Sequence, residues 1–125
     1  PHWKIQNKKI DKENKIVTAD LIVVDKYLTG ALDSTLTSDD IILKIDGVEN
    51  TAITKTLSSG EYSGNVSGLK QIKYTLTLSG WEAASKKLQE ETGKIYSEYS
   101  GTVGITIPAN KVTDQYGNKS KQRSS

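Results

Sequence analysis

The stretch GTVGITIPANKVTDQYGNKS, residues 101–120, carries the clearest fold signal in this chain. Its first part alternates apolar with small or polar residues, as a strand with one buried face does, and the apolar positions are Val103, Ile105 and Ile107. Pro108 ends the strand, because proline has no N–H to donate to a neighbouring strand. Turn residues follow at Asp114, Gly117 and Asn118. The stretch therefore predicts a strand and then a reversal of the chain.

The same alternation recurs along the rest of the chain. It predicts strands over residues 16–25, 41–45, 48–57, 74–79 and 102–107. Asp-Gly at positions 46–47 suits the tight turn of a hairpin, whereas residues 62–69 predict a loop or an irregular edge. Strict alternation gives each sheet one apolar face, so two sheets must pack together. We therefore predict an all-β sandwich.

One segment departs from this alternation and predicts a helix. Residues 79–82, Ser-Gly-Trp-Glu, form a capping box, and position 93 is a glycine of the kind that ends helices. Good helix formers lie between them, and Glu82 and Lys86 have the spacing of a favourable pair. The sequence predicts one short helix of about three turns. We expect it before the penultimate strand, across one end of the sandwich.

The stretch 101–120 closely resembles the closing signature of bacterial immunoglobulin-like domains, a strand G-T-V-x-V-x-[IV]-P-A followed by V-T-D-x-x-G-N. The matching residues are Gly101, Thr102, Val103, Ile105, Ile107, Pro108, Ala109, Val112, Thr113, Asp114, Gly117 and Asn118. Residues 36–49, LTSDDIILKIDGVE, resemble an earlier block of the family, so the likeness covers roughly residues 10–120. It departs at residues 119–125, KSKQRSS, which lack the apolar alternation that the family's last strand usually has.

This resemblance implies an immunoglobulin-like Greek-key β-sandwich. Such domains occur in tandem on secreted or wall-attached bacterial proteins, many of them Gram-positive, as stalk, spacer or adhesive units. We therefore expect a noncatalytic extracellular structural or interaction module of a larger bacterial surface protein. The expected partners are neighbouring domains of the same chain, and a glycan or a host or matrix protein. The alternatives are a carbohydrate- or matrix-binding adhesin module and an accessory domain of a secreted glycan-active enzyme.

Length and charge fit one domain over residues 1–125, with a core at about 10–120 and basic polar ends at 1–9 and 119–125. The net charge is +2, but residues 1–15 and 119–125 hold eight basic and two acidic residues, a charge of +6. Residues 16–118 hold nine lysines and thirteen acidic residues, a charge of −4. Residues 16–118 thus lack the clustered cations of a nucleic-acid site, and we expect no nucleic-acid partner. Solvated tails, linker residues and edge-strand charges are the alternatives for the basic ends.

Composition also bears on membranes and on catalysis. The longest apolar stretch, residues 21–24, is far shorter than the ~18 apolar residues that span a bilayer, so we expect no membrane insertion. The chain has no cysteine, which excludes disulfides, thiol catalysis and cysteine-bound metals, and its one histidine is His2. Paired carboxylates for glycoside chemistry would have to come from Glu82, Glu90, Glu91 and Glu98. Three of these lie on the predicted helix as ordinary surface residues, so we expect neither an enzyme nor a cofactor.

Hard oxygen ligands suggest a calcium site as one hypothesis. Asp114 and Asn118, joined by Asp39 or Asp40, have the carboxylate and amide oxygens that calcium prefers. No run of alternating acidic residues with an EF-hand spacing accompanies them. The sequence therefore favours turn and strand-entry roles for these four residues over metal binding.

Aromatic residues suggest carbohydrate binding as another hypothesis. The two tryptophans and the six tyrosines raise it, because an exposed aromatic face stacks on sugar rings, and Trp81 and Trp3 are the named candidates. Trp81 shares the inner face of the predicted helix with Leu88, which favours a core position. Trp3 lies in a polar stretch and is placed to begin a first edge strand.

Overall fold

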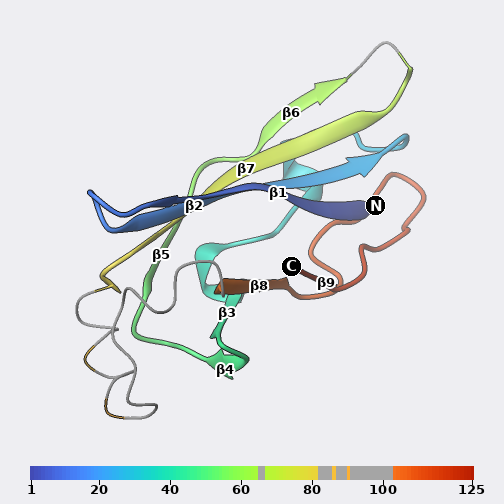
Figure 1. Ribbon diagram of the computed structural model, residues 1–125. Coiled ribbons are helices and arrows are strands. Elements are labelled where there is room, and N and C mark those ends of the chain that lie inside the picture. The colour runs from blue at the N-terminus through green and yellow to red at the C-terminus, as the bar shows by residue number, and fades with distance from the viewer. Residues whose placement is uncertain (65–66, 82–85, 87–89, 91–102) are drawn as a thin grey trace.

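The structure is a computed structural model that describes all residues except 65–66, 82–85, 87–89 and 91–102 (Figure 1). One antiparallel sheet contains β1 (His2–Asp11), β2 (Ile16–Asp25), β5 (Thr54–Leu57), β6 (Glu61–Gly64) and β7 (Lys70–Ser79). The other contains β3 (Ile42–Ile45), β4 (Val48–Glu49), β8 (Val103–Ile107) and β9 (Arg123–Ser124). Two 3-10 helices, η1 (Ala31–Asp33) and η2 (Ser38–Asp40), lie between β2 and β3.

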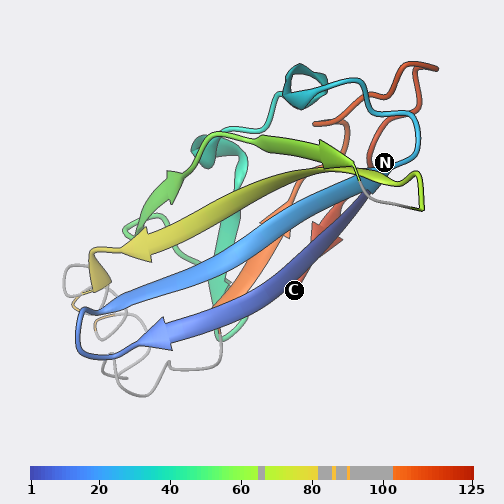
Figure 2. The same ribbon diagram turned by 90° about the horizontal axis from the view of Figure 1, so that it is seen from above.

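The two sheets lie face to face, as Figure 2 shows from above. The strand order is β1-β2-β7-β5 in the first sheet, where β6 also pairs with β7, and β4-β3-β8-β9 in the second. Every second residue of the central strands points into the space between the sheets. These buried residues are Val17, Ala19, Leu21, Val23, Leu43, Ile45, Ile72, Tyr74, Leu76, Leu78, Val103, Ile105 and Ile107. The predicted all-β sandwich and its inward alternation are confirmed.

The chain passes from the second sheet to the first directly after the predicted hairpin. Asp46 and Gly47 both have positive φ, 50° and 80°, and connect β3 to β4 as predicted. The prediction of one strand over residues 48–57 is wrong, because these residues form β4 and β5 in different sheets. The buried Asn50 makes the break: its Oδ1 accepts the N–H groups of Ala52 at 2.9 Å and Ile53 at 3.2 Å.

Residues 61–64 form β6, a short strand at the edge of the first sheet. Of the two predictions for residues 62–69, a loop or an irregular edge, the structure therefore shows the edge for residues 62–64. β7 begins at Lys70 and offers an unpaired edge, along which β6 runs from Glu61↔Lys73 to Gly64↔Lys70. Gly60 precedes β6 and lies close to the core. A Cβ at this position would lie 2.8 Å from Ile72 Cγ2 and 2.9 Å from Tyr74 Cζ. Glycine is therefore required here for the chain to approach β7.

Both basic ends take part in the sandwich. β1 is an edge strand along β2. Of the three alternatives for the basic N-terminal end, the structure therefore shows edge-strand charges. Trp3 on β1 is 1% exposed, so the core extends beyond the expected residues 10–120. At the other end β9 pairs with β8 despite its polar sequence, and the Ser125 N–H donates to Ile105 O at 2.8 Å.

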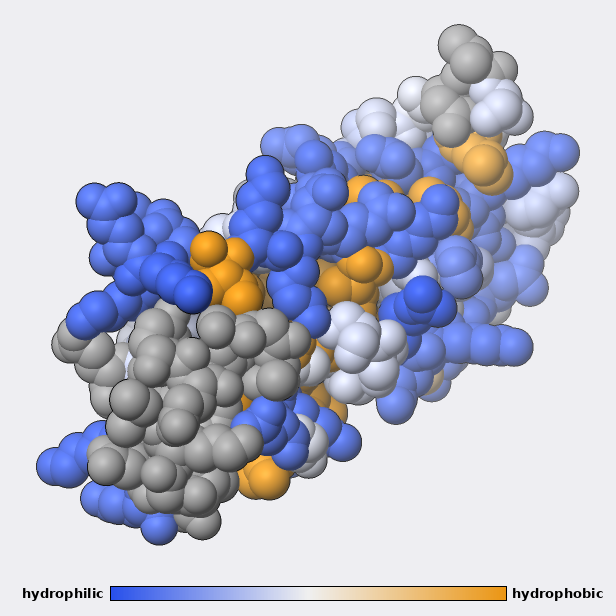
Figure 3. Space-filling model, in the orientation of Figure 1, coloured by the Kyte–Doolittle hydropathy of each residue, from blue (hydrophilic) through white to orange (hydrophobic). Residues whose placement is uncertain are grey.

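The predicted helix before the penultimate strand falls almost wholly outside the described residues. Of that stretch only Trp81, Lys86 and Glu90 are described beyond position 80, and all three have helical backbone. Within the described part of the chain, no helix has both the length and the apolar character needed to cross a membrane. The face seen in Figure 3 is mainly hydrophilic, with apolar residues in small separate patches.

Candidate functional site

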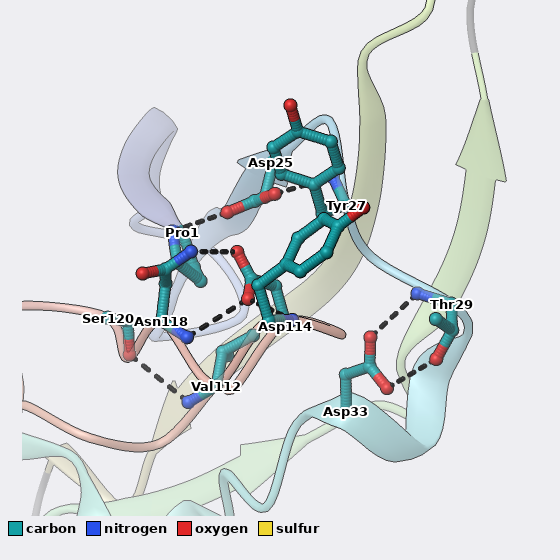
Figure 4. A network of polar contacts seen from close by, with 10 residues as sticks. Pro1, Asp25, Tyr27, Thr29, Asp33, Val112, Asp114, Asn118 and Ser120 are labelled. Atoms are coloured by element: carbon teal, nitrogen blue, oxygen red, sulfur yellow. Dashed lines mark hydrogen bonds and ion pairs between the residues drawn. The ribbon is translucent and has the colours of Figure 1, made fainter.

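Two exposed tyrosines meet at one end of the sandwich. Tyr27 follows β2 and is labelled in Figure 4 beside Asp114. Tyr116 lies in the turn over residues 114–118 that the sequence predicts after β8. Their ring centroids are 4.8 Å apart at an interplanar angle of 87°, an edge-to-face contact. Tyr27 is 39% exposed and Tyr116 is 68% exposed. We call these two residues the tyrosine pair.

Asp114 holds the turn that carries Tyr116. Its Oδ1 accepts the backbone N–H groups of Tyr116 at 2.9 Å and Asn118 at 3.0 Å, and its Oδ2 accepts Asn118 Nδ2 at 3.0 Å. Gly117 has a φ of 80°, a left-handed conformation that favours glycine. The turn interpretation of Asp114, Gly117 and Asn118 is therefore what the structure shows.

Asp25 plays the same part for Tyr27. Its Oδ1 accepts the Tyr27 N–H at 2.6 Å, and its Oδ2 lies 2.6 Å from the amino group of Pro1. The carbonyl of Tyr27 in turn accepts the N–H of Gln115 at 3.1 Å. The loop after β2 and the 114–118 turn are thus joined through their backbones, which sets the distance between the two rings.

The electrostatics keep Asp114 ionised. Its side chain is 6% exposed, and burial alone raises the pKa of a carboxyl group. Here the hydrogen bonds from Asn118 and the Tyr116 N–H outweigh burial and hold the pKa of Asp114 below its ordinary value of 3.8. The carboxylate therefore accepts all three hydrogen bonds at neutral pH.

Polar groups surround the tyrosine pair. Lys26 Nζ lies 5.9 Å from the centroid of the Tyr27 ring, within the range of a cation–π contact. The next loop is also fixed, because Asp33 accepts both the N–H and the hydroxyl of Thr29 at 2.7 Å. The pair is thus an exposed amphipathic surface on backbone segments that side-chain hydrogen bonds hold in place.

The four calcium candidates lie in two separate places. Asp114 and Asn118 bond to each other, whereas Asp39 and Asp40 lie on η2. Asp40 accepts the Thr37 N–H at 2.8 Å and forms an ion pair with Lys111 Nζ at 2.9 Å. Although burial raises its pKa, the contacts with Thr37 and Lys111 hold the pKa of Asp40 below its usual value. No group of three or more His, Cys, Asp or Glu residues that could hold a metal occurs among the described residues.

Neither tryptophan is placed to stack on a sugar. Trp3 is 1% exposed and its ring lies 6.2 Å from that of Tyr74. Trp81 is 2% exposed and donates its Nε1–H to Leu78 O at 3.2 Å. The carbohydrate hypothesis is therefore wrong for Trp3 and Trp81, because both rings are part of the core, the position that the sequence favoured for Trp81.

The carboxylates considered for glycoside chemistry lie mostly outside the described residues. Glu90 is exposed, while Glu82, Glu91 and Glu98 are not described. The sequence interpretation missed the tyrosine pair, although Tyr116 occupies the tip of a recognised turn, where side chains point to solvent. Comparison of the chain with protein-family models, with curated proteins and with solved structures finds no match.

Proposed function

We propose that this chain is a noncatalytic structural and interaction module of a larger secreted or wall-attached bacterial protein, with an immunoglobulin-like Greek-key topology. The strand order supports this topology. The orders β1-β2-β7-β5 and β4-β3-β8-β9 follow the A-B-E-D and C′-C-F-G orders of immunoglobulin-like sandwiches, with β6 as an additional strand between the equivalents of D and E. The resemblance of residues 101–120 to the family's closing signature points the same way.

The contact surface of the module is the tyrosine pair, and its ligand is a carbohydrate. One observation carries this proposal: both rings are exposed while the backbones beneath them are fixed by the Asp25 and Asp114 carboxylates. Tyrosine gives a large apolar contact with few rotatable bonds, and a fixed backbone loses little entropy on binding. The pair therefore has the properties of a preorganised anchor.

The chemistry around the pair suits a sugar ring. The apolar face of a pyranose packs on an aromatic ring, while its hydroxyls need polar partners at the rim. The tyrosine hydroxyls and the ammonium group of Lys26 supply such partners. A matrix protein is the other partner class that an exposed tyrosine pair suits, because tyrosine is common among the residues that dominate protein interfaces.

The test is binding of the whole chain to a glycan array and to immobilised matrix proteins. We expect glycan binding that the double variant Tyr27→Ala/Tyr116→Ala weakens by about tenfold or more. Val48→Ala is the control, because Val48 is an exposed apolar residue (46%) on β4, outside the two segments that carry the pair. Binding that the double variant leaves unchanged would place the contact surface elsewhere, and the absence of any glycan or matrix binding would leave a spacer role alone.

A further inference from the structure

A basic pocket lies between the start of β1 and the C-terminal segment. Its volume is about 490 Å³. The lining residues are Pro1, His2, Trp3, Asn118, Lys119, Lys121, Gln122 and Arg123. Three of them are cationic side chains, and none is acidic. The carbohydrate proposal for the tyrosine pair does not use this pocket.

The three cations are free to meet a ligand. The side chains of Lys119, Lys121 and Arg123 are exposed. Within the part of the chain that the structure describes, none of them forms an ion pair with a carboxylate. Like charges this close together repel one another, so a bound anion would relieve an unfavourable arrangement.

The segment that carries these cations is anchored rather than a solvated tail. Ser120 is 1% exposed, and its Oγ accepts the Val112 N–H at 3.1 Å. The Ser120 carbonyl accepts the Asn110 N–H at 2.8 Å, and Arg123 begins β9. The cations at positions 119, 121 and 123 are therefore exposed on a segment that is anchored at Ser120 and at β9.

The pocket is rich in hydrogen-bond donors. The lysine and arginine side chains that line it donate hydrogen bonds and accept none. Trp3 also lines the pocket, but its Nε1 atom is buried, so the indole serves as a reporter beside the cations and is not counted among the ligand-binding groups. No lining residue carries a carboxylate that could accept hydrogen bonds from the cations. An anion with several acceptor oxygens would accept the hydrogen bonds that these cationic side chains can donate.

We propose that the basic pocket binds a tetrahedral oxyanion, a phosphate or sulfate group, held chiefly by Lys119, Lys121 and Arg123. The guanidinium group of Arg123 suits such a group because it donates two parallel hydrogen bonds, while the lysines act as point charges. The group is either a free ion or an ester on an anionic polysaccharide. This site is independent of the tyrosine pair.

The test is titration of the ¹⁵N-labelled chain at constant ionic strength with sodium phosphate, sodium sulfate, sodium acetate and heparin. The Trp3 indole N–H resonance, assigned with Trp3→Phe, and the amides of residues 119–123 report on the pocket. The pocket variant is Lys119→Gln/Lys121→Gln/Arg123→Gln. The matched control, Lys12→Gln/Lys44→Gln/Lys86→Gln, removes the same charge from exposed sites elsewhere on the chain.

We expect saturable shifts confined to the pocket with phosphate or sulfate, weaker shifts with acetate, and a dissociation constant about tenfold higher in the pocket variant only. Binding of heparin alone, with the same difference between the two variants, supports the pocket and assigns the group to a polymer. Shifts that stay linear with all four probes overturn the proposal. Equal weakening in both triple variants overturns it too, because that result reflects net charge rather than a site.

Discussion

The carboxylate of Asp114 fixes the backbone of Tyr116 and leaves its ring exposed. Oδ1 accepts the Tyr116 N–H at 2.9 Å, while the Tyr116 side chain is 68% exposed and touches Tyr27 edge to face. The buried side chain of Asp114 thus determines the position of the exposed Tyr116 ring. Stability of the turn and presentation of the tyrosine pair are therefore coupled, and they can be tested together.

Asp114→Ala removes the three hydrogen bonds that hold the 114–118 turn. We expect the melting temperature at pH 7 to fall by about 5 °C and the contact between Tyr27 and Tyr116 to loosen. Thermal melts and tyrosine ring resonances measure the two effects. Asp39→Ala is the control, since Asp39 is exposed and no hydrogen bond or ion pair of its side chain occurs among the described residues. An equal fall in the control contradicts the specific role of Asp114.

The stability difference between the parent chain and Asp114→Ala also depends on pH. The pKa of Asp114 is lower in the folded chain than its ordinary value of 3.8, so the ionised form stabilises the fold. This contribution is complete above about pH 5 and is lost as the pH falls through the folded pKa. Melts between pH 7 and pH 2 should show the difference narrowing below pH 4. A difference that stays constant down to pH 2 contradicts this linkage.

Asn50→Ala tests the passage between the sheets. The substitution removes the oxygen that accepts the Ala52 and Ile53 N–H groups at the point where the chain leaves β4 for β5. We expect a loss of about 1–3 kcal/mol in the free energy of unfolding, because buried donors are left unpaired. Urea denaturation measures it. Thr51→Ala, at an exposed neighbouring position, should cost less than about 0.5 kcal/mol.

The sequence predicts those parts of the fold in which one physical signal dominates. Residues 74–79 are one such part, because their apolar alternation leaves one face that can be buried. The Asp46-Gly47 turn is another, because few residue types adopt a positive φ. The break between β4 and β5 could not be found this way. Residues 48–57 keep a strand-like pattern throughout. The point at which the chain leaves one sheet for the other is marked by the burial of Asn50, which the sequence does not reveal.

The candidate site was harder to predict than the fold. Asp114 was recognisable as a turn residue from its neighbours, but its carboxylate could also suit calcium until the structure showed its hydrogen bonds to Tyr116 and Asn118. Tyr27 and Tyr116 are far apart in the sequence, and no local pattern brings them together. Their contact depends on the register between the loop after β2 and the turn after β8, which is tertiary information.

Trp3 and Trp81 differ in the hydrogen bonding of the indole nitrogen, which predicts different costs for the same substitution. Both rings are buried. Trp81 Nε1–H donates to Leu78 O at 3.2 Å, whereas Trp3 Nε1 has no partner in the part of the chain that the structure describes. Trp→Phe removes the same volume at either site, so Trp81→Phe should lower the free energy of unfolding by about 1 kcal/mol more than Trp3→Phe. Urea denaturation of the two single variants measures the difference. Equal costs would contradict the assignment of the two indole groups.

Gly60→Ala tests the close approach of the chain to β7. The added Cβ would lie 2.8 Å from Ile72 Cγ2 and 2.9 Å from Tyr74 Cζ, both in the core, so these side chains must shift. We expect a loss of about 1–3 kcal/mol in the free energy of unfolding, the usual cost of overpacking. Gly30→Ala is the matched control, because nothing lies within 4 Å of a Cβ at position 30. If Gly60→Ala is as stable as Gly30→Ala, the segment that leads into β6 can move away from Ile72 and Tyr74. That result would contradict a requirement for glycine at position 60.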